Sequence, residues 1–407
     1  MFETYLEKYA ALAIKIGVNV QPGQRLLIIN APPETAPFIR ALTKAAYQAG
    51  ARYVGVLWQD EHLGLIRLQH GSRESLSEFP TWTVDAMRQV AEEGGAHLSI
   101  SARTPDILSG QDPEALKIIQ QAANQHMQPI SQLVMNVAMN WSVAGAVVPG
   151  WAAKVFPDVP VEQAIAQLWD AIFDACRVKE ADPVAAWEQH IITMQRRGDY
   201  LTHKGYTALH YRAAGTDLMV GLPAGHRWIS GRVTAGNGIP CVPNLPTEEI
   251  FTLPHRERVD GIVTSTKPLV YQGVSIENLT LKFENGKVIE AHADKGETDL
   301  NNLIQVDDGA ARLGEVALVA HSSPISKLGF LFHSMLYDEN ASCHLALGRA
   351  YKIALDGKLD DAAFTAAGGN NSLIHADFMI GSAQMDIDGI RADGEREPIF
   401  RAGEWVI

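Results

Sequence analysis

Residues 23–59 constrain the fold most, because they read in turn as a strand, a helix and a second strand. GQRLLIINA and ARYVGVLWQ are apolar runs typical of strands, and PPETAPFIRALTKAAYQAG between them has helical spacing, with Pro near its start and Gly past its end. A strand, a helix and a strand at this spacing form a βαβ unit with parallel strands. The chain is therefore predicted to begin with an α/β domain.

The alternation of predicted helices and strands continues to about residue 200. ALKIIQQAANQ keeps the helical rhythm, and SQLVMNVAM (131–139) is predicted to be another apolar strand. Two strong helices follow, VEQAIAQLWDAIFDACRV and DPVAAWEQHIITMQRRG, and the second is predicted to close at Gly198. This part of the chain adds helices and strands to the predicted α/β domain.

The second half is predicted to be rich in strands. YTALHYRAAGTDLMVGL reads as two short strands around a turn, and Asn285-Gly286 in LTLKFENGKVIEAHA suits a type I′ hairpin turn. One late helix is expected over 341–357, ASCHLALGRAYKIALDG. Because 407 residues exceed what one hydrophobic core usually supports, we expect two domains. They are an N-terminal α/β domain with a parallel sheet, residues 1–200, and a β-rich α+β C-terminal domain, residues 201–407.

The net charge and the cysteine content indicate which partners and which cellular compartment suit the protein. With 34 basic and 47 acidic residues the net charge is −13, which argues against nucleic acid and against an anionic membrane surface as partners. The three cysteines form no CxxC pair, which favours a reducing compartment. The N-terminus lacks the apolar core of a signal peptide, and no apolar run approaches the roughly 20 residues that span a bilayer. We expect a cytoplasmic protein.

Several common catalytic signatures are absent from the sequence. It contains no GxSxG nucleophile elbow, no HExxH helix and no GxxxxGK phosphate loop, so a nucleotide-binding role for the βαβ half is not supported. Cys343 and His344 are neighbours, and neighbours on a helix point about 100° apart. A cysteine nucleophile needs a facing imidazole, so it is not favoured here.

Acidic and imidazole side chains instead stand beside apolar sequence at several places in the second half. In SLIHADFMIGS, His375 and Asp377 are two residues apart and leave one face of a strand together. On the predicted helix, Tyr351 lies two turns after His344 and shares its face. The complete set of candidates is Glu248, Glu249, Glu315, Glu339, His344, Tyr351, His375 and Asp377.

Each of these residues also has an ordinary structural explanation. A lone buried histidine is commonly satisfied by a backbone carbonyl, and Glu248 with Glu249 can lie in a solvated turn. The combination is more telling, because three glutamates, two histidines and one aspartate are enough ligands for two divalent ions. Such a pair of ions activates a water and stabilises a developing oxyanion, as peptide-bond hydrolysis requires.

The same segments carry a family resemblance. NLPTEEIFTLPHRERVDG, LGEVALV, YDENASCHLALGRAY and IHADFMIGS resemble the signature segments of the aminopeptidase T/aminopeptidase S family of dinuclear metallo-aminopeptidases. WAAKVFPD and LWDAIFDACRV extend the resemblance to the N-terminal half, so that it runs essentially end to end. It implies a homodimeric hydrolase that removes N-terminal amino acids from peptides with broad specificity, through a metal-activated water at a two-metal centre.

The resemblance also implies roles for individual residues. Glu315 matches the bridging carboxylate, and Tyr351 matches a tyrosine whose hydroxyl polarises the carbonyl or oxyanion. Glu339 matches either a ligand or a supporting acid/base, and either Glu315 or Glu339 carries the proton to the leaving amine. The implied metal ligands are Glu249, Glu315, Glu339, His344, His375 and Asp377.

Two alternatives to an aminopeptidase stay open from the sequence. One is a two-metal hydrolase of another small amide, and the other is a metal-binding scaffold without activity. The implied cofactors are two divalent ions per subunit, for which mixed carboxylate and imidazole ligands accept zinc, cobalt, manganese or magnesium. The implied partners are peptides with a free N-terminus and a second copy of the chain.

Overall fold

The structure is a computed structural model that describes residues 1–271, 274–357 and 359–407. The chain divides into two compact units, each discontinuous in sequence. The N-terminal unit comprises 1–190, 232–247 and 331–336, and the C-terminal unit comprises 191–231, 248–330 and 337–407. The division into domains at residue 200 stays a prediction. None of the helices within the described ranges combines the length and the apolar character that crossing a bilayer demands.

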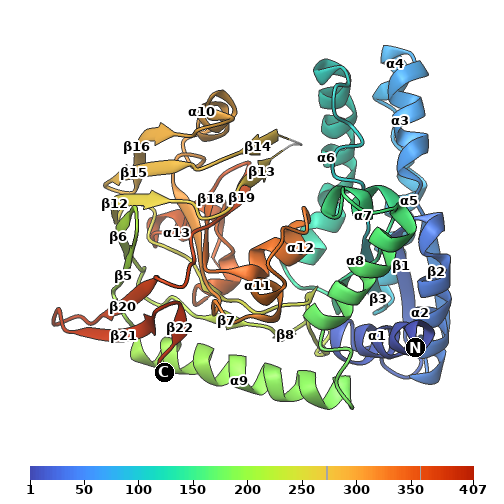
Figure 1. The fold of residues 1–407 in the computed structure, drawn as a ribbon, viewed down its shortest axis with the longest axis horizontal. Coiled ribbons are helices and arrows are strands. Elements are labelled where there is room, and N and C mark those ends of the chain that lie inside the picture. Colours follow the sequence, from blue (N-terminus) through green and yellow to red (C-terminus); the bar gives the residue numbers. More distant parts are fainter. Residues whose placement is uncertain (272–273, 358) are drawn as a thin grey trace. The chain divides into compact units, whose positions relative to one another are not determined.

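The N-terminal unit is built on a five-stranded parallel sheet with the order β10-β4-β3-β1-β2 (Figure 1). Its strands are β1 Arg25–Ala31, β2 Tyr53–Trp58, β3 Ala96–Ser101, β4 Trp141–Gly145 and β10 Asn244–Leu245. Its helices are α1 Phe2–Leu12, α2 Ala36–Gln48, α3 Glu61–His70, α4 Arg73–Leu76, α5 Thr81–Glu92, α6 Pro113–Met135, α7 Pro149–Val155 and α8 Val161–Ala175. The short strands β8 Val233–Thr234 and β9 Pro240–Cys241 pair with each other. The predicted α/β architecture is confirmed.

The βαβ unit forms where the sequence predicts it. β1 and β2 pair in parallel, and α2 connects them. Pro37 lies in the first turn of α2, where its missing N–H costs nothing, and Gly50 follows the helix with a positive φ of 94°.

The strand predicted over 131–139 is wrong. Residues up to Met135 continue α6, and the strand that enters the sheet is β4, Trp141–Gly145. Leu133 and Val134 pack against the apolar cluster that contains Leu27 and Ile130. Because a short apolar run fits a buried helix as well as a buried strand, local periodicity could not separate the two.

The helix predicted to close at Gly198 continues further, since α9 spans Pro183–Lys204. A Cβ at Gly198 would lie only 3.3 Å from the Oγ of Ser230 and 3.4 Å from the carbonyl oxygen of Trp228. Gly198 thus allows close packing on the helix rather than ending it.

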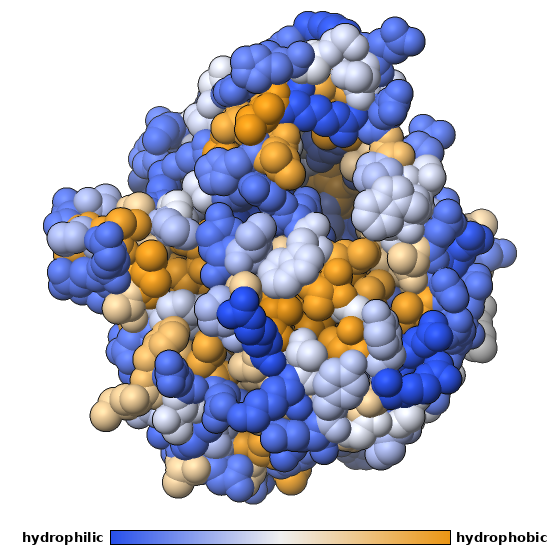
Figure 2. Space-filling view, turned by 90° about the vertical axis from the view of Figure 1, so that its right-hand side faces the viewer, coloured by the Kyte–Doolittle hydropathy of each residue, from blue (hydrophilic) through white to orange (hydrophobic). Residues whose placement is uncertain are grey.

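β2 forms one edge of the parallel sheet and is poorly covered. Tyr53 is 60% exposed and Trp58 is 50% exposed, and the neighbouring helix α3 exposes Leu63 and Ile66. Figure 2 views the molecule from the side on which Figure 1 places β2 and α3, and it shows hydrophobic surface (orange) between hydrophilic residues (blue). An uncovered sheet edge of this kind can pair with another chain.

The C-terminal unit contains two larger sheets in which all neighbouring strands are antiparallel. The eight-stranded sheet has the order β16-β15-β12-β6-β5-β20-β21-β22, with β5 Ala208–Ala213, β6 Thr216–Gly221, β12 Val259–Thr264, β15 Thr280–Glu284, β16 Lys287–His292, β20 Asp386–Ile390, β21 Arg396–Arg401 and β22 Glu404–Trp405. The five-stranded sheet has the order β19-β18-β17-β11-β7, with β7 Ile229–Ser230, β11 Ile250–Thr252, β17 Leu313–Leu318, β18 His344–Gly348 and β19 His375–Met379. The β-rich second half is confirmed.

Shorter elements complete this part of the chain. β13 Leu269–Tyr271 pairs with β14 Val274–Ile276. The helices are α10 Glu297–Ile304, α11 Pro324–Leu328, α12 Met335–Asp338 and α13 Asp361–Ala366. The predicted hairpin is present between β15 and β16, with positive φ at both Asn285 (49°) and Gly286 (79°), as a type I′ turn requires.

The core of the C-terminal unit lies between the two large sheets. One buried cluster joins alternate residues of the eight-stranded sheet, such as Leu218 and Val263, to alternate residues of the five-stranded sheet, such as Val316, Leu345 and Phe378. Since side chains alternate along a strand, the residues between them on the five-stranded sheet point to its other face. That second face carries the candidate site.

The late helix predicted over 341–357 is wrong. His344–Gly348 form β18, a central strand of the five-stranded sheet, and a short 3₁₀ turn follows at Lys352–Ala354. Every residue of β18 is buried, so its sequence HLALG shows no alternation, and Leu and Ala also favour helices. Pairing with β17 and β19 decides the conformation.

His97 on β3 makes the stability of the N-terminal unit sensitive to acid. The residue is 3% exposed, and burial lowers the pKa of its imidazole from 6.5 to about 4, although the nearby Met87 carbonyl opposes the shift. Between pH 6.5 and pH 4 the unfolded chain therefore binds a proton that the folded chain does not. Folding free energy is lost as the pH falls through this window, by about 3 kcal/mol near pH 4.

We predict that His97→Leu removes this pH dependence. The measurement is denaturant unfolding of both proteins at several pH values between 7.5 and 4, followed through the transition of the N-terminal unit. As the pH falls, the unfolding free energy of the wild type should decrease more than that of the variant. An unchanged difference across the window would contradict the prediction.

Candidate metal centre

The register of three neighbouring strands, β17, β18 and the edge strand β19, brings acidic residues together on one face of the five-stranded sheet. Glu315 on β17 pairs with Ala346 on β18, and Ala346 pairs with Asp377 on β19. His344 lies two residues before Ala346, and His375 lies two residues before Asp377, so strand alternation puts both imidazoles on this face. Side chains far apart in the sequence thus meet above neighbouring strands.

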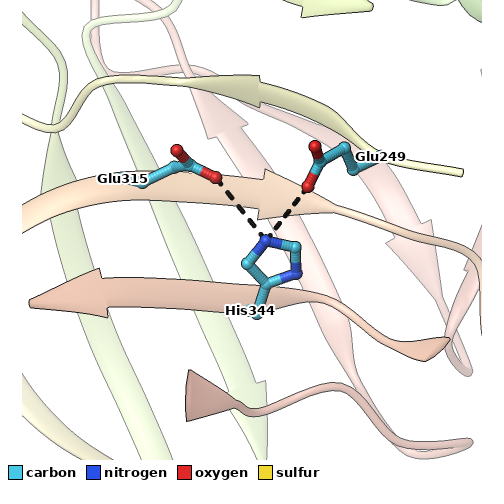
Figure 3. A group of neighbouring side chains, drawn as sticks. All are labelled: Glu249, Glu315 and His344. Carbon is cyan, nitrogen blue, oxygen red and sulfur yellow. Dashed lines mark ion pairs between the residues drawn. The ribbon is translucent and has the colours of Figure 1, made fainter. Parts of the chain in front are cut away.

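The first group consists of Glu249, Glu315 and His344 (Figure 3). Glu249 directly precedes β11, and its Oε2 lies 3.2 Å from Nε2 of His344. Oε1 of Glu315 lies 3.5 Å from the same nitrogen. The three side chains converge from three different strand regions.

The second group consists of Glu315, His375 and Asp377. Nε2 of His375 lies 3.3 Å from Oδ1 of Asp377 and 3.8 Å from Oε2 of Glu315. Glu315 therefore takes part in both groups, with Oε1 towards one histidine and Oε2 towards the other. A carboxylate in this position can bridge two cations.

Backbone carbonyls fix which nitrogen of each histidine faces the carboxylates. Nδ1 of His375 lies 2.7 Å from the carbonyl oxygen of Arg349, and Nδ1 of His344 lies 3.2 Å from that of Ser342. A carbonyl can only accept a hydrogen bond, so Nδ1 donates in both cases. Nε2 is then free to bind a metal ion, as in metal sites where the second ring nitrogen is held by an outer partner.

Positive charge is required at this face of the sheet. Glu315 is 5% exposed and Asp377 is 7% exposed, and burial raises the pKa of Glu315. Burial by itself lowers the pKa of His375, but the carboxylates of Asp377 and Glu315 raise it to about 10. The geometry thus draws a cation, either a proton or a metal ion, into the space between these side chains.

The side chains fit divalent metal ions. Oδ1 of Asp377 is buried and has no hydrogen-bond donor among the described residues, as expected of an oxygen that serves as a ligand. The ligand atoms of each group lie within 4.8 Å of one another. Ligands that are each about 2.1 Å from one ion lie within roughly 4.2 Å of each other, so only small side-chain adjustments are needed.

Glu339 lies close to this centre but outside both groups among the described residues. It begins a 3₁₀ turn, Glu339–Ala341. Burial, together with the charges of Glu249 and Asp377, raises the pKa of its carboxyl well above the ordinary value. Glu339 is therefore disposed to carry a proton.

The buried amide of Asn340 connects two of these segments. Its Oδ1 accepts a hydrogen bond from the backbone N–H of Glu248 at 2.7 Å, and its Nδ2 lies 3.4 Å from Oε1 of Glu339. Asn340 is fully buried. Asn340 is not among the residues predicted from the sequence, although its place directly after the candidate Glu339 was a signal.

Tyr351 also approaches the centre, but not from a helix shared with His344. The ring of Tyr351 meets that of His375 edge to face, with centroids 5.0 Å apart. Burial and the charges of Glu315 and Asp377 raise the pKa of its hydroxyl. The hydroxyl therefore keeps its proton and can donate a hydrogen bond.

Cys343 is excluded as a nucleophile that uses His344. The two residues are neighbours at the start of β18, so they point to opposite faces of the sheet. Burial raises the pKa of the Cys343 thiol to about 11, and Sγ lies 3.3 Å from the carbonyl oxygen of Val319. The thiol is a structural group.

Comparisons with known proteins place the whole chain in one group. Residues 2–405 match the family model described as thermophilic metalloprotease (M29). The chain is 45% identical to aminopeptidase 2 of Geobacillus stearothermophilus over 407 residues, covering 100% of the chain and 98% of that protein. It is 43% identical to aminopeptidase T of Thermus thermophilus over 406 residues, covering 100% of the chain and 99% of that protein.

A solved structure is also similar over its full length. The wild-type AmpT structure from Thermus thermophilus superimposes with a TM-score of 0.95 at 42% identity, and the match covers 100% of both chains. The family resemblance inferred from the sequence motifs is therefore confirmed, and so is the fold. The roles of the individual side chains stay predictions.

Proposed function

This chain belongs to the thermophilic metalloprotease family M29 and is a metallo-aminopeptidase, and we propose that it removes N-terminal amino acids from peptides with broad specificity at a two-ion centre. The observation that carries the two-ion proposal is the position of Glu315. Its two carboxylate oxygens face two different histidines, each of which has its own second carboxylate.

The ligands divide into two sets with one shared member. Glu249, His344 and one oxygen of Glu315 would hold the first ion, and His375, Asp377 and the other oxygen of Glu315 would hold the second. When bound, two divalent ions would supply Lewis-acid polarisation of the substrate carbonyl and would lower the pKa of the attacking water. Oxygen and imidazole ligands accept zinc, cobalt, manganese or magnesium, and we propose that these ions support activity.

Tyr351 and Glu339 supply the remaining groups. The Tyr351 hydroxyl donates a hydrogen bond to the scissile carbonyl oxygen as negative charge develops there. Burial and the charges of Glu249 and Asp377 raise the pKa of the Glu339 carboxyl, so this group would carry a proton from the attacking water to the leaving amine. In this proposal Glu339 is the acid/base rather than a ligand, and Glu315 is the bridging ligand.

The first test uses protein from which metal has been removed with a chelator, and a pair of peptides that differ only in N-terminal acetylation. We expect zinc, cobalt, manganese or magnesium to restore release of the first residue from the free peptide only. His375→Ala should lose this activity, because it removes a ligand. His292→Ala, which changes an exposed histidine, is the matched control and should keep it.

The other outcomes favour the two alternatives. Equal cleavage of both peptides would assign the centre to hydrolysis of another amide. Metal binding without cleavage of either peptide would favour a scaffold without activity.

A second prediction concerns Tyr351. Replacing it with Phe keeps the ring contact with His375 but removes the donor, so kcat should fall about 100-fold with little change in KM. Steady-state kinetics give both constants, and the metal content of the variant should equal that of the wild type. A variant with normal kcat would exclude the hydroxyl from transition-state stabilisation.

We also propose a homodimer, as the family resemblance implies. The uncovered edge strand β2 and the apolar residues of α3 offer a surface for pairing (Figure 2). Sedimentation velocity should show a dimer for the wild type and a monomer for Trp58→Glu combined with Leu63→Glu. Ile289→Glu, on an exposed position of β16, is the control. A monomeric wild type at micromolar concentration would contradict the proposal.

We propose that the protein acts in the cytoplasm. All three cysteines are free and buried, which suits a reducing compartment. Recovery of the native protein in an extracellular or membrane fraction of its cells would contradict this location.

A further inference from the structure

Two alanines stand among the ligands on the functional face of the five-stranded sheet. They are Ala317 on β17 and Ala346 on β18, and both are completely buried. Neighbours on the opposite face of the same strands are large, for example Leu345 and Leu347, which belong to the core. Alanine is also a poor strand former, so its position here is not explained by strand propensity.

Ala346 lies between two members of the second ligand group. It pairs with Glu315 on one side and with Asp377 on the other. Gly348, two residues further along β18, pairs with His375. The small side chain of Ala346 therefore lies beneath the space towards which Glu315, His375 and Asp377 point.

Ala317 occupies the equivalent place in the first group. It pairs with His344 on one side and with Phe251 on the other, and it lies two residues after Glu315 on the same face. Glu249 lies two residues before Phe251, and its carboxylate lies 3.2 Å from Nε2 of His344, the strand partner of Ala317. Each ligand group is thus built around one alanine.

The spacing of the sheet explains what these alanines do. Cβ atoms of directly paired residues lie about 4.5–5.5 Å apart, so a larger side chain between two carboxylates would fill the volume that their shared cation needs. From this geometry we infer that Ala317 and Ala346 each form the floor of one ion position, and that their small size decides whether both ions bind. The inference rests on the two-ion centre proposed above and deepens it.

Valine substitutions test the inference, because valine fits a central strand but adds two methyl groups. We expect Ala346→Val to bind one ion in place of two at ion concentrations that saturate the wild type, with the affinity for the second ion reduced by about 10- to 100-fold. Ala317→Val should also bind one ion. The measurement is a titration of metal-free protein with cobalt(II), in which calorimetry and the absorption of the bound ion report binding. Metal analysis of the dialysed protein then gives the number of ions retained.

Ala376→Val is the matched control. Ala376 is a buried alanine on β19 next to Asp377, but it belongs to the core on the opposite face. This variant carries the same overpacking in the same sheet and should still bind two ions. Ala346→Gly removes bulk and should bind two ions as well. Circular dichroism and thermal unfolding of the chelated proteins establish that each variant is folded.

Double variants identify which ion is lost. Adding His375→Ala to Ala346→Val should remove no further ion, whereas adding His344→Ala should remove the remaining one. For Ala317→Val, adding His344→Ala should remove no further ion, whereas adding His375→Ala should remove the remaining one. If one valine variant does not fold, the other carries the same test for its own ion.

Each outcome is decisive. Folded valine variants that keep two ions at wild-type affinity would overturn the role of the alanines while leaving the two-ion centre intact. Loss of an ion in Ala376→Val or in Ala346→Gly would also overturn it, because bulk on the ligand face would not be the cause. A wild-type protein that binds fewer than two ions would overturn the two-ion centre itself, and the inference with it.

Discussion

The shared carboxylate of Glu315 is the interaction on which the functional part of the structure depends. It is almost completely buried in a central strand, and its two oxygens face His344 and His375. A carboxylate is costly to bury unless positive charge meets it, and here two other buried or half-buried carboxylates, Glu249 and Asp377, stand close by. Metal ions bound by these side chains would offset this concentration of negative charge, and their binding would then stabilise the folded sheet.

In the C-terminal unit, one face of the five-stranded sheet packs into the core and the other face carries the candidate ligands. Val316, Leu345 and Phe378 point into the space between the sheets and supply the core. Glu315, His344 and Asp377 alternate with them and point to the opposite face. A rigid, hydrogen-bonded sheet with a packed core on one side can hold ligands on the other side at fixed spacing. Backbone carbonyls of Ser342 and Arg349 then set the orientation of the two imidazoles.

Much of this could be predicted from local sequence, and the exceptions have a common cause. Alternation within β19 put His375 and Asp377 on one face, and turn chemistry placed the hairpin at Asn285-Gly286. β18 was mistaken for a helix because a strand buried on both faces has no alternation, and SQLVMNVAM was mistaken for a strand because a short apolar run fits either state. In both places tertiary packing chose between two conformations that local propensity left nearly equal.

The sequence by itself determined the family, the parallel sheet of the first half, the abundance of strands in the second half and most of the side chains that gather at the centre, because residue type and short-range spacing carry that information. Only the tertiary structure brought the two oxygens of Glu315 towards His344 and His375, left Glu339 outside both groups among the described residues and paired Ala317 and Ala346 with ligand residues. These facts depend on strand register across β11, β17, β18 and β19. Register follows from pairing between segments far apart in the chain, and a shift of one residue would turn every ligand towards the core.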